Sequence, residues 1–163
     1  MTVVRHGGSI IPARGRRATY AAAMARDQRL AALAAVPMFS ACTKRELQKL
    51  ARAGDELAIQ AGRRLVDQGA TGREAFFILD GTASVRRGNR KIATLGPGDC
   101  FGELALLDHQ PRTASVTADT PMKVYVLDSR HFEGVLDDIP GLARRLLGQL
   151  ASRVRDLDAK AYG

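Results

Sequence analysis

A series of short β-strand-like segments fills the central half of the chain and limits the folds available to it. The segments are rich in β-branched or aromatic residues, and turns such as Asp80-Gly81 and Gly88-Asn89 separate them. We predict strands over residues 57–61, 63–67, 75–80, 82–87, 90–95, 114–118 and 122–128. Short strands at this spacing indicate an antiparallel barrel or sandwich, and the lack of β-α-β alternation argues against a Rossmann-type sheet.

Helical patterns precede the strands. Residues 18–36 are alanine-rich with apolar residues at near-helical spacing, and Pro37 ends this N-terminal helix. Thr43 and Glu46 have the spacing of a capping box, which predicts a second helix that ends at Gly54.

Helical patterns also follow the strands. We predict a short helix capped by Asp128 or Ser129, and then a longer helix with Pro140 in its first turn. The longer helix carries an apolar stripe, which serves packing or a dimer surface: Leu142, Leu146, Leu150, Val154 and Leu157. The predicted fold class is therefore α+β, an antiparallel, jelly-roll-like β-roll flanked by N-terminal helices and two C-terminal helices.

The net charge of +8 is concentrated at the N-terminus. Residues 1–36 contain six arginines and one aspartate, so they carry +5, and residues 37–163 carry the remaining +3. We predict a disordered basic leader over residues 1–17, the N-terminal helix over 18–36 and one binding domain over 37–163. The leader could touch nucleic acid or acidic lipid, but it lacks interleaved aromatic residues, which favours a solvated segment.

Several classes of protein are excluded by the composition. No apolar run approaches the roughly 20 residues that a membrane span needs, and the N-terminus lacks the apolar core of a secretory signal. We therefore expect a cytoplasmic protein without a membrane span. Cys42 and Cys100 form no metal-binding pattern with the scattered histidines, so we expect no metal and no disulfide framework.

The stretch over residues 101–116 carries the recognisable chemistry. Gly102 has no Cβ, so the backbone can approach a ligand closely there, and the amides that follow lie at the start of a predicted helix over residues 103–107. Arg112 offers a planar fork of donors for phosphate oxygens, and Thr113 adds a hydroxyl beside it. Glu103 accepts hydrogen bonds when ionised, which suits sugar hydroxyls. The stretch thus predicts a site for a phosphate and a ribose hydroxyl held close together.

This stretch resembles the phosphate-binding cassette of the cyclic-nucleotide-binding domain family. The motifs Gly96-Pro97-Gly98-Asp99, Phe101-Gly102-Glu103 and Arg112-Thr113-Ala114 occur in the family's order and spacing, and the similarity covers about residues 33–159. The family includes domains of cyclic-nucleotide-regulated channels, catabolite-activator-type regulators and protein kinase A regulatory subunits. The resemblance implies that the arginine pairs with the cyclic phosphate and the glutamate accepts from the ribose 2′-hydroxyl.

The resemblance also implies a set of ligand-binding residues. In the cassette these are Gly102, Glu103, Leu104, Ala105, Arg112, Thr113 and Ala114. Val85, Ala93 and Leu95 would support the base, and Arg153 and Leu157 would form a lid on the last helix. Cys100 stands where an aromatic residue is common and is expected to lie outside the pocket. Thr113 can serve either the phosphate or a guanine amino group, so it leaves the choice between cyclic AMP and cyclic GMP open.

The predicted function is a stand-alone sensor that binds cyclic AMP, or cyclic GMP, without a cofactor and signals by rearranging its C-terminal helix. A phosphodiesterase is not expected, because hydrolysis needs a metal or an activated nucleophile and no such cluster is visible. The alternative is a catabolite-activator-type regulator truncated before its DNA-binding domain. Because the chain ends at Gly163, almost where the last helix does, we expect no sequence-specific DNA binding. The downstream partner and the oligomeric state are left open.

Overall fold

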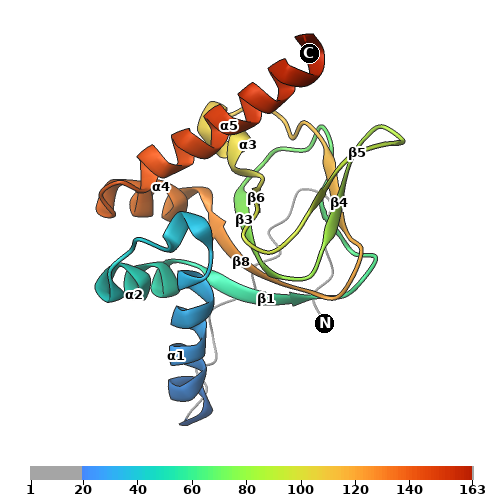
Figure 1. Ribbon diagram of the computed structural model, residues 1–163. Helices are drawn as coiled ribbons and strands as arrows, with labels where there is room; N and C mark the ends of the chain where they lie inside the picture. The colour runs from blue at the N-terminus through green and yellow to red at the C-terminus, as the bar shows by residue number, and fades with distance from the viewer. Residues whose placement is uncertain (1–19, 163) are drawn as a thin grey trace.

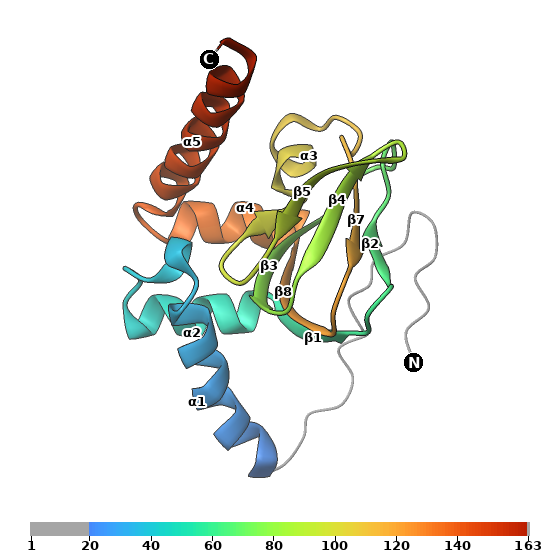
Figure 2. The same ribbon diagram turned by 45° about the vertical axis from the view of Figure 1, so that its right-hand side comes forward.

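A computed structural model of the chain describes residues 20–162 (Figures 1 and 2). The predicted basic leader, residues 1–17, lies outside the described residues. In chain order the elements are α1 (Tyr20–Ala34), the 3-10 helix η1 (Pro37–Phe39), α2 (Lys44–Ala53), β1 (Asp55–Ile59), β2 (Arg64–Val66), β3 (Glu74–Asp80), β4 (Ala83–Arg87), β5 (Arg90–Leu95), β6 (Cys100–Phe101), α3 (Glu103–Asp108), β7 (Ser115–Ala118), β8 (Met122–Asp128), α4 (Ser129–Asp138) and α5 (Leu142–Tyr162).

The strands form two four-stranded sheets, in the orders β1-β8-β3-β6 and β2-β7-β4-β5. Neighbouring strands are antiparallel throughout both sheets. The sheets face each other across an apolar interior, and Phe76 of β3 is paired there with Val126 of β8 and Phe101 of β6. Together with the flanking helices, this arrangement is that of an antiparallel β-roll, and it confirms the predicted fold class.

Alternate residues of β3 reach two separate apolar clusters. Phe76 and Ile78 belong to the cluster between the sheets, whereas Ala75 and Phe77 belong to the cluster under the helices. This is the two-residue periodicity of a strand buried on both faces. The first sheet is therefore the wall between the interior of the roll and the helical layer.

The helices pack on the outer face of this wall, and Figure 2 shows most of them on one side of the strands. They contribute buried residues to one cluster: Leu30 and Leu33 of α1, Phe39 of η1, Leu50 of α2, Phe132 of α4, and Leu142 and Leu146 of α5. At the start of α2, the Thr43 hydroxyl accepts from the amide of Glu46 while the Glu46 carboxylate accepts from the amide of Thr43. The predicted capping box is thus confirmed.

The structure adds one strand to the prediction, decides between two predicted caps and corrects the start of one helix. Residues 100–101 form the short strand β6, which was not predicted. Asp128, not Ser129, caps α4, because its carboxylate accepts from the amide of His131 at 2.8 Å. Pro140 does not lie in the first turn of α5, since Gly141 follows it with a φ of +83° and the helix begins only at Leu142.

Candidate ligand-binding site

The short helix α3 interrupts the strands between β6 and β7, and Gly102 is its N-cap. Gly102 has a φ of +86°, which side chains other than glycine rarely adopt. A Cβ at this position would lie 2.3 Å from Nη1 of Arg112 and 2.8 Å from the carbonyl oxygen of Glu74. Glycine is therefore required at position 102 for two reasons: the backbone has a positive φ there, and the side chain of Arg112 approaches too closely to leave room for a Cβ.

Arg112 extends into the roll and is only 9% exposed. Its Nη1 donates to the carbonyl of Gly102 at 2.8 Å, and its Nη2 donates to the carbonyl of Glu74 at 2.9 Å. The guanidinium carbon lies 6.0 Å from the centre of the Phe76 ring, a distance at the limit of cation–π contact. These contacts fix the plane of the guanidinium, although two of its five N–H groups suffice for both carbonyl bonds.

Burial is the main influence on the charge of Arg112. It lowers the pKa of the guanidinium, and the nearby carboxylates of Glu74 and Glu103 act in the opposite direction. Since the ordinary pKa of arginine lies far above neutral pH, the side chain stays cationic at neutral pH. The site thus holds a positive charge in a largely desolvated place, where an anion interacts with it more strongly than in water.

Glu103 is 1% exposed and is bound to the C-terminal helix. Its Oε1 accepts from Nη1 of Arg153 at 2.6 Å, while Nη2 of Arg153 donates to the carbonyl of Cys100 at 2.6 Å. The Cys100 thiol lies 3.5 Å from Oε2 of the same carboxylate. One arginine of α5 therefore ties that helix to both β6 and the first residue of α3.

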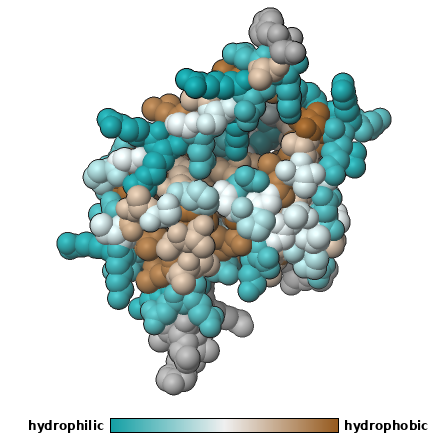
Figure 3. Space-filling view, viewed as in Figure 1, coloured by the Kyte–Doolittle hydropathy of each residue, from teal (hydrophilic) through white to brown (hydrophobic). Residues whose placement is uncertain are grey.

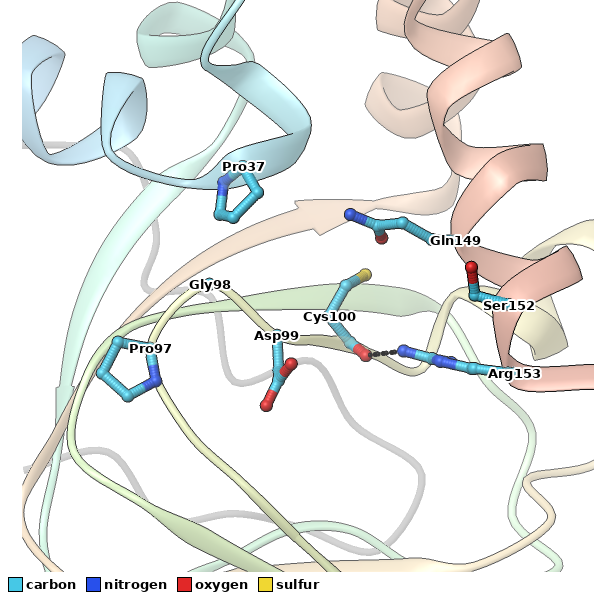
Figure 4. Close-up of a pocket in the computed structure, with 8 residues that line it drawn as sticks. All are labelled: Pro37, Pro97, Gly98, Asp99, Cys100, Gln149, Ser152 and Arg153. Carbon is cyan, nitrogen blue, oxygen red and sulfur yellow. Dashed lines mark hydrogen bonds between the residues drawn. The ribbon is translucent and has the colours of Figure 1, made fainter. Parts of the chain in front are cut away.

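A pocket lies beside the bond between Arg153 and the carbonyl of Cys100 (Figure 4). It is formed by η1, the turn between β5 and β6, and α5. Its lining residues are Pro37, Pro97, Gly98, Asp99, Cys100, Gln149, Ser152 and Arg153. Apart from Arg153, these are not residues of the predicted ligand set, so the pocket does not coincide with the face expected to support a base.

The rest of the predicted cassette residues lie along α3 and the chain that leads to β7. Leu104 and Ala105 are in the first turn of α3. Thr113 is exposed, and its carbonyl accepts from Nε of Arg87 at 3.3 Å, while Ala114 is half-buried. The structure thus brings Gly102, Arg112 and Thr113 to one end of the roll, next to the tip of the β4–β5 hairpin.

The three residues expected to support a base lie on the second sheet. Val85 is the cross-strand partner of both Ala93 and Val116, and Leu95 is the partner of Ala83. Val85 and Leu95 pack against the cluster between the sheets. Ala93 lies on the same face as these two, so all three residues face the interior of the roll, although Ala93 is exposed.

Arg153 and Leu157, the two residues of the expected lid, have different environments. Arg153 is half-buried and contacts Glu103, whereas Leu157 is 65% exposed. In this structure Leu157 therefore does not cover the interior of the roll. The lid remains a prediction, and Arg153 has a contact with the cassette that the sequence did not suggest.

Three residues of the site were missed. Glu74 accepts a hydrogen bond from Arg112 through its backbone carbonyl, a role that no sequence pattern reveals. Phe76 could have been found from its inward position on β3; its ring stacks on Phe101 with centres 4.8 Å apart. Cys100 was expected outside the pocket as a bystander, but it is 3% exposed and contacts Glu103 and Arg153.

Among residues 20–162, no helix is both long and apolar enough to cross a membrane. Over the same range, no group of three or more histidine, cysteine or acidic residues is placed to hold a metal ion.

The fold and the cassette define a ligand-binding domain, and the comparisons identify its family. Residues 56–138 match the family model described as "Cyclic nucleotide-binding domain", and the chain belongs to that family. A curated relative is the cAMP-dependent protein kinase regulatory subunit of Hypocrea atroviridis, 34% identical over 110 residues. This match spans 68% of the chain but only 24% of the relative, so the chain corresponds to about a quarter of that subunit.

Two solved structures show the same domain. One is the regulatory domain of Toxoplasma gondii PKA with cAMP, 27% identical with a TM-score of 0.70, over 82% of this chain and 52% of that one. The other is the catabolite activator protein of Thermus thermophilus, 26% identical with a TM-score of 0.70, over 77% of this chain and 61% of that one. The predicted family is therefore confirmed, and the chain is a regulatory-type binding domain.

Proposed function

We propose that this chain is a cyclic-nucleotide sensor that binds cyclic AMP inside the β-roll and leaves it chemically unchanged. The observation that carries the proposal is the buried guanidinium of Arg112, held in plane by the carbonyls of Gly102 and Glu74. A cyclic phosphodiester carries one negative charge and presents two free oxygens. A fixed guanidinium fork matches that group in both charge and shape.

The ribose would meet Glu103, and this is where binding reaches α5. The carboxylate of Glu103 already accepts from Arg153. A ribose 2′-hydroxyl that donates to the same carboxylate shares or displaces that bond, so the ligand changes how firmly α5 is attached to the cassette. A ligand shifts a conformational equilibrium only through such a difference in contacts. The signal proposed is therefore a change in the docking of α5.

The base would lie against the inward face of the second sheet. Val85, Ala93 and Leu95 offer an apolar surface there. That surface suits a flat purine but does not distinguish adenine from guanine. The preference for cyclic AMP is supported by two relatives, since one is named for its dependence on cAMP and the other holds cAMP. Thr113, exposed beside Arg112, is the residue where a preference for guanine would arise.

The decisive experiment is titration calorimetry of the full chain with cyclic AMP, cyclic GMP and linear 5′-AMP. We expect cyclic AMP to bind more tightly than cyclic GMP, and 5′-AMP to bind weakly because of its extra charge and open geometry. Replacing Arg112 by alanine should cost about 2–5 kcal/mol, at least a thirtyfold loss of affinity. The matched control is Arg90→Ala, which removes the same charge from an exposed position on β5.

Equal affinity in the parent and in Arg112→Ala would refute the phosphate site. Equal losses in Arg112→Ala and Arg90→Ala would mean that overall charge attracts the ligand, without a built site. Recovery of intact cyclic AMP after prolonged incubation is expected of a sensor, and its conversion to 5′-AMP would identify an enzyme instead.

A further inference from the structure

The hairpin formed by β4 and β5 carries four cations around its turn and no acidic residue. β4 ends with Arg86 and Arg87, and β5 begins with Arg90 and Lys91. All four side chains are exposed, and among the residues that the structure describes none of them forms an ion pair. The tip of the hairpin is therefore a site of concentrated positive charge without a compensating carboxylate.

The strand register places these cations directly opposite one another. Arg86 is the cross-strand partner of Lys91. In the same way, Arg87 is the partner of Arg90. Like charges in directly opposite positions destabilise an antiparallel pair. Natural sequences break such a local rule mainly at functional sites, and an anionic partner would relieve this repulsion.

β5 is also a free edge of its sheet. The strand order is β2-β7-β4-β5, so within the described residues β5 pairs with β4 alone. None of the six residues of β5 is buried, and Ile92, which the register skips between Lys91 and Ala93, is 42% exposed. A strand with one neighbour and no buried residue gains little from packing, and its outer edge presents unpaired backbone N–H and C=O groups.

We propose that an extended acidic segment of another protein adds to the sheet along the free edge of β5. The edge alternates donors and acceptors, which a second polypeptide strand satisfies, whereas phosphate groups only accept. The cations exclude a second copy of this hairpin as the occupant, because the two tips would repel each other. Residues 1–36 carry a net charge of +5, so the N-terminal segment of this chain is not complementary either.

The tip of the hairpin is held in place before a partner arrives. The amide of Gly88 donates to Oε1 of Gln68 at 2.8 Å, and Nε of Arg87 donates to the carbonyl of Thr113 at 3.3 Å. These bonds tie the tip to the loop between β2 and β3 and to the chain between α3 and β7. A partner strand therefore meets a hairpin that is already ordered, which lowers the entropic cost of binding.

The hairpin is accessible to a partner. In Figure 1 its tip projects beyond the other strands at the right of the view, and the space-filling view shows hydrophilic side chains projecting there (Figure 3). A strand as long as β5 spans about 20 Å, so a segment of roughly six to eight residues is sufficient. Because this interface is small, we expect a dissociation constant on the order of 10–100 µM.

The test is fluorescence anisotropy of the full chain with a labelled peptide of about eight residues that alternates glutamate with valine or threonine. We expect saturable binding that weakens at least about tenfold between roughly 50 mM and 500 mM salt. The control is the same peptide with N-methylated backbone amides, which keeps the charge but removes the backbone donors. It should bind at least about tenfold more weakly, because it cannot complete the strand ladder.

The variant Arg86→Glu separates binding from folding. It places opposite charges across the pair with Lys91, so the urea midpoint should not fall, while the affinity for the acidic peptide should fall at least about fivefold. The matched control is Arg144→Glu, which makes the same change of charge at an exposed position of α5 and should leave the affinity unchanged.

Hydrogen exchange locates the contact. The acidic peptide should slow amide exchange within residues 90–95, because a new strand bonds the free edge of β5, and the N-methylated peptide should not.

Four results would overturn the inference. Equal affinities for the two peptides would mean that charge alone attracts them. Equal losses in Arg86→Glu and Arg144→Glu would place the contact away from the hairpin. Tighter binding of an oligothymidylate of equal charge than of the acidic peptide would identify a nucleic-acid surface. No binding at about 1 mM peptide would leave the hairpin as a solvated basic tip.

Discussion

The requirement for glycine at position 102 can be tested against a second glycine with nearly the same backbone. Gly102 and Gly62 have φ values of +86° and +85°, but a Cβ at Gly62 would meet nothing within 4 Å. Alanine at either position pays about 1–2 kcal/mol for the left-handed conformation. At position 102 it must also displace Arg112, since the new Cβ would lie 2.3 Å from Nη1.

The additional cost at position 102 follows from the bonds that Arg112 loses. It makes two charge-assisted hydrogen bonds, to Gly102 and Glu74, each worth about 1.5–3 kcal/mol. Gly102→Ala should therefore be about 3 kcal/mol or more less stable than Gly62→Ala in urea denaturation followed by circular dichroism. Calorimetry should show that Gly102→Ala loses affinity for cyclic AMP as severely as Arg112→Ala, whereas Gly62→Ala binds normally. Equal stabilities and equal affinities for the two glycine variants would refute this reasoning.

Arg153→Gln should destabilise the fold by about 2 kcal/mol, because it leaves the carboxylate of Glu103 buried without its cation, and the partial exposure of Arg153 reduces the full cost. Arg155→Gln, on an exposed part of the same helix, should change the urea midpoint little. Burial, and then Glu103, raise the pKa of the Cys100 thiol well above its ordinary value, so the folded state keeps a proton that the unfolded state loses. The protonated thiol makes its full contribution to stability below about pH 8.5, and above that pH the free energy of unfolding decreases by up to about 1.4 kcal/mol per pH unit. Cys100→Ala lacks the thiol, so its free energy of unfolding should fall less steeply between roughly pH 8.5 and 10. Any binding to DNA should be independent of sequence and fall steeply with salt, because the excess positive charge lies in residues 1–36; salt-resistant, sequence-selective retardation of a DNA fragment would contradict this.

The fold was predictable because the strands of the roll carry their own signals. The two-residue alternation of Phe76 and Ile78 against Ala75 and Phe77 places β3 between two apolar layers, and the turns are marked by glycine. The start of α5 was not predictable in the same way. Pro140 suits the first turn of a helix, but the positive φ of Gly141 separates it from the helix, and a sequence does not reveal which conformation a glycine takes.

The cassette was predictable where side-chain chemistry and chain spacing agree, as for Gly102 and Arg112. The contact between Arg153 and Glu103 was not, because 50 residues separate them. Whether Arg153 and Glu103 come into contact depends on how α5 packs against the roll. The resemblance assigns Arg153 to a lid over the base, which stays a prediction, and the structure adds its contact with the carboxylate at the start of α3. The role of the Glu74 carbonyl as an acceptor for Arg112 could not be predicted for a different reason, since every residue has a backbone carbonyl.

The main-chain bonds of Arg112 affect how the sequence can change over time. The two acceptors that orient Arg112 are main-chain oxygens of Gly102 and Glu74, so they are present whatever side chain stands at position 74. Substitutions at Glu74 can alter the local charge, but they leave that anchor in place as long as β3 keeps its course. The orientation of the guanidinium therefore depends on the path of the backbone, and substitutions at position 74 do not change it.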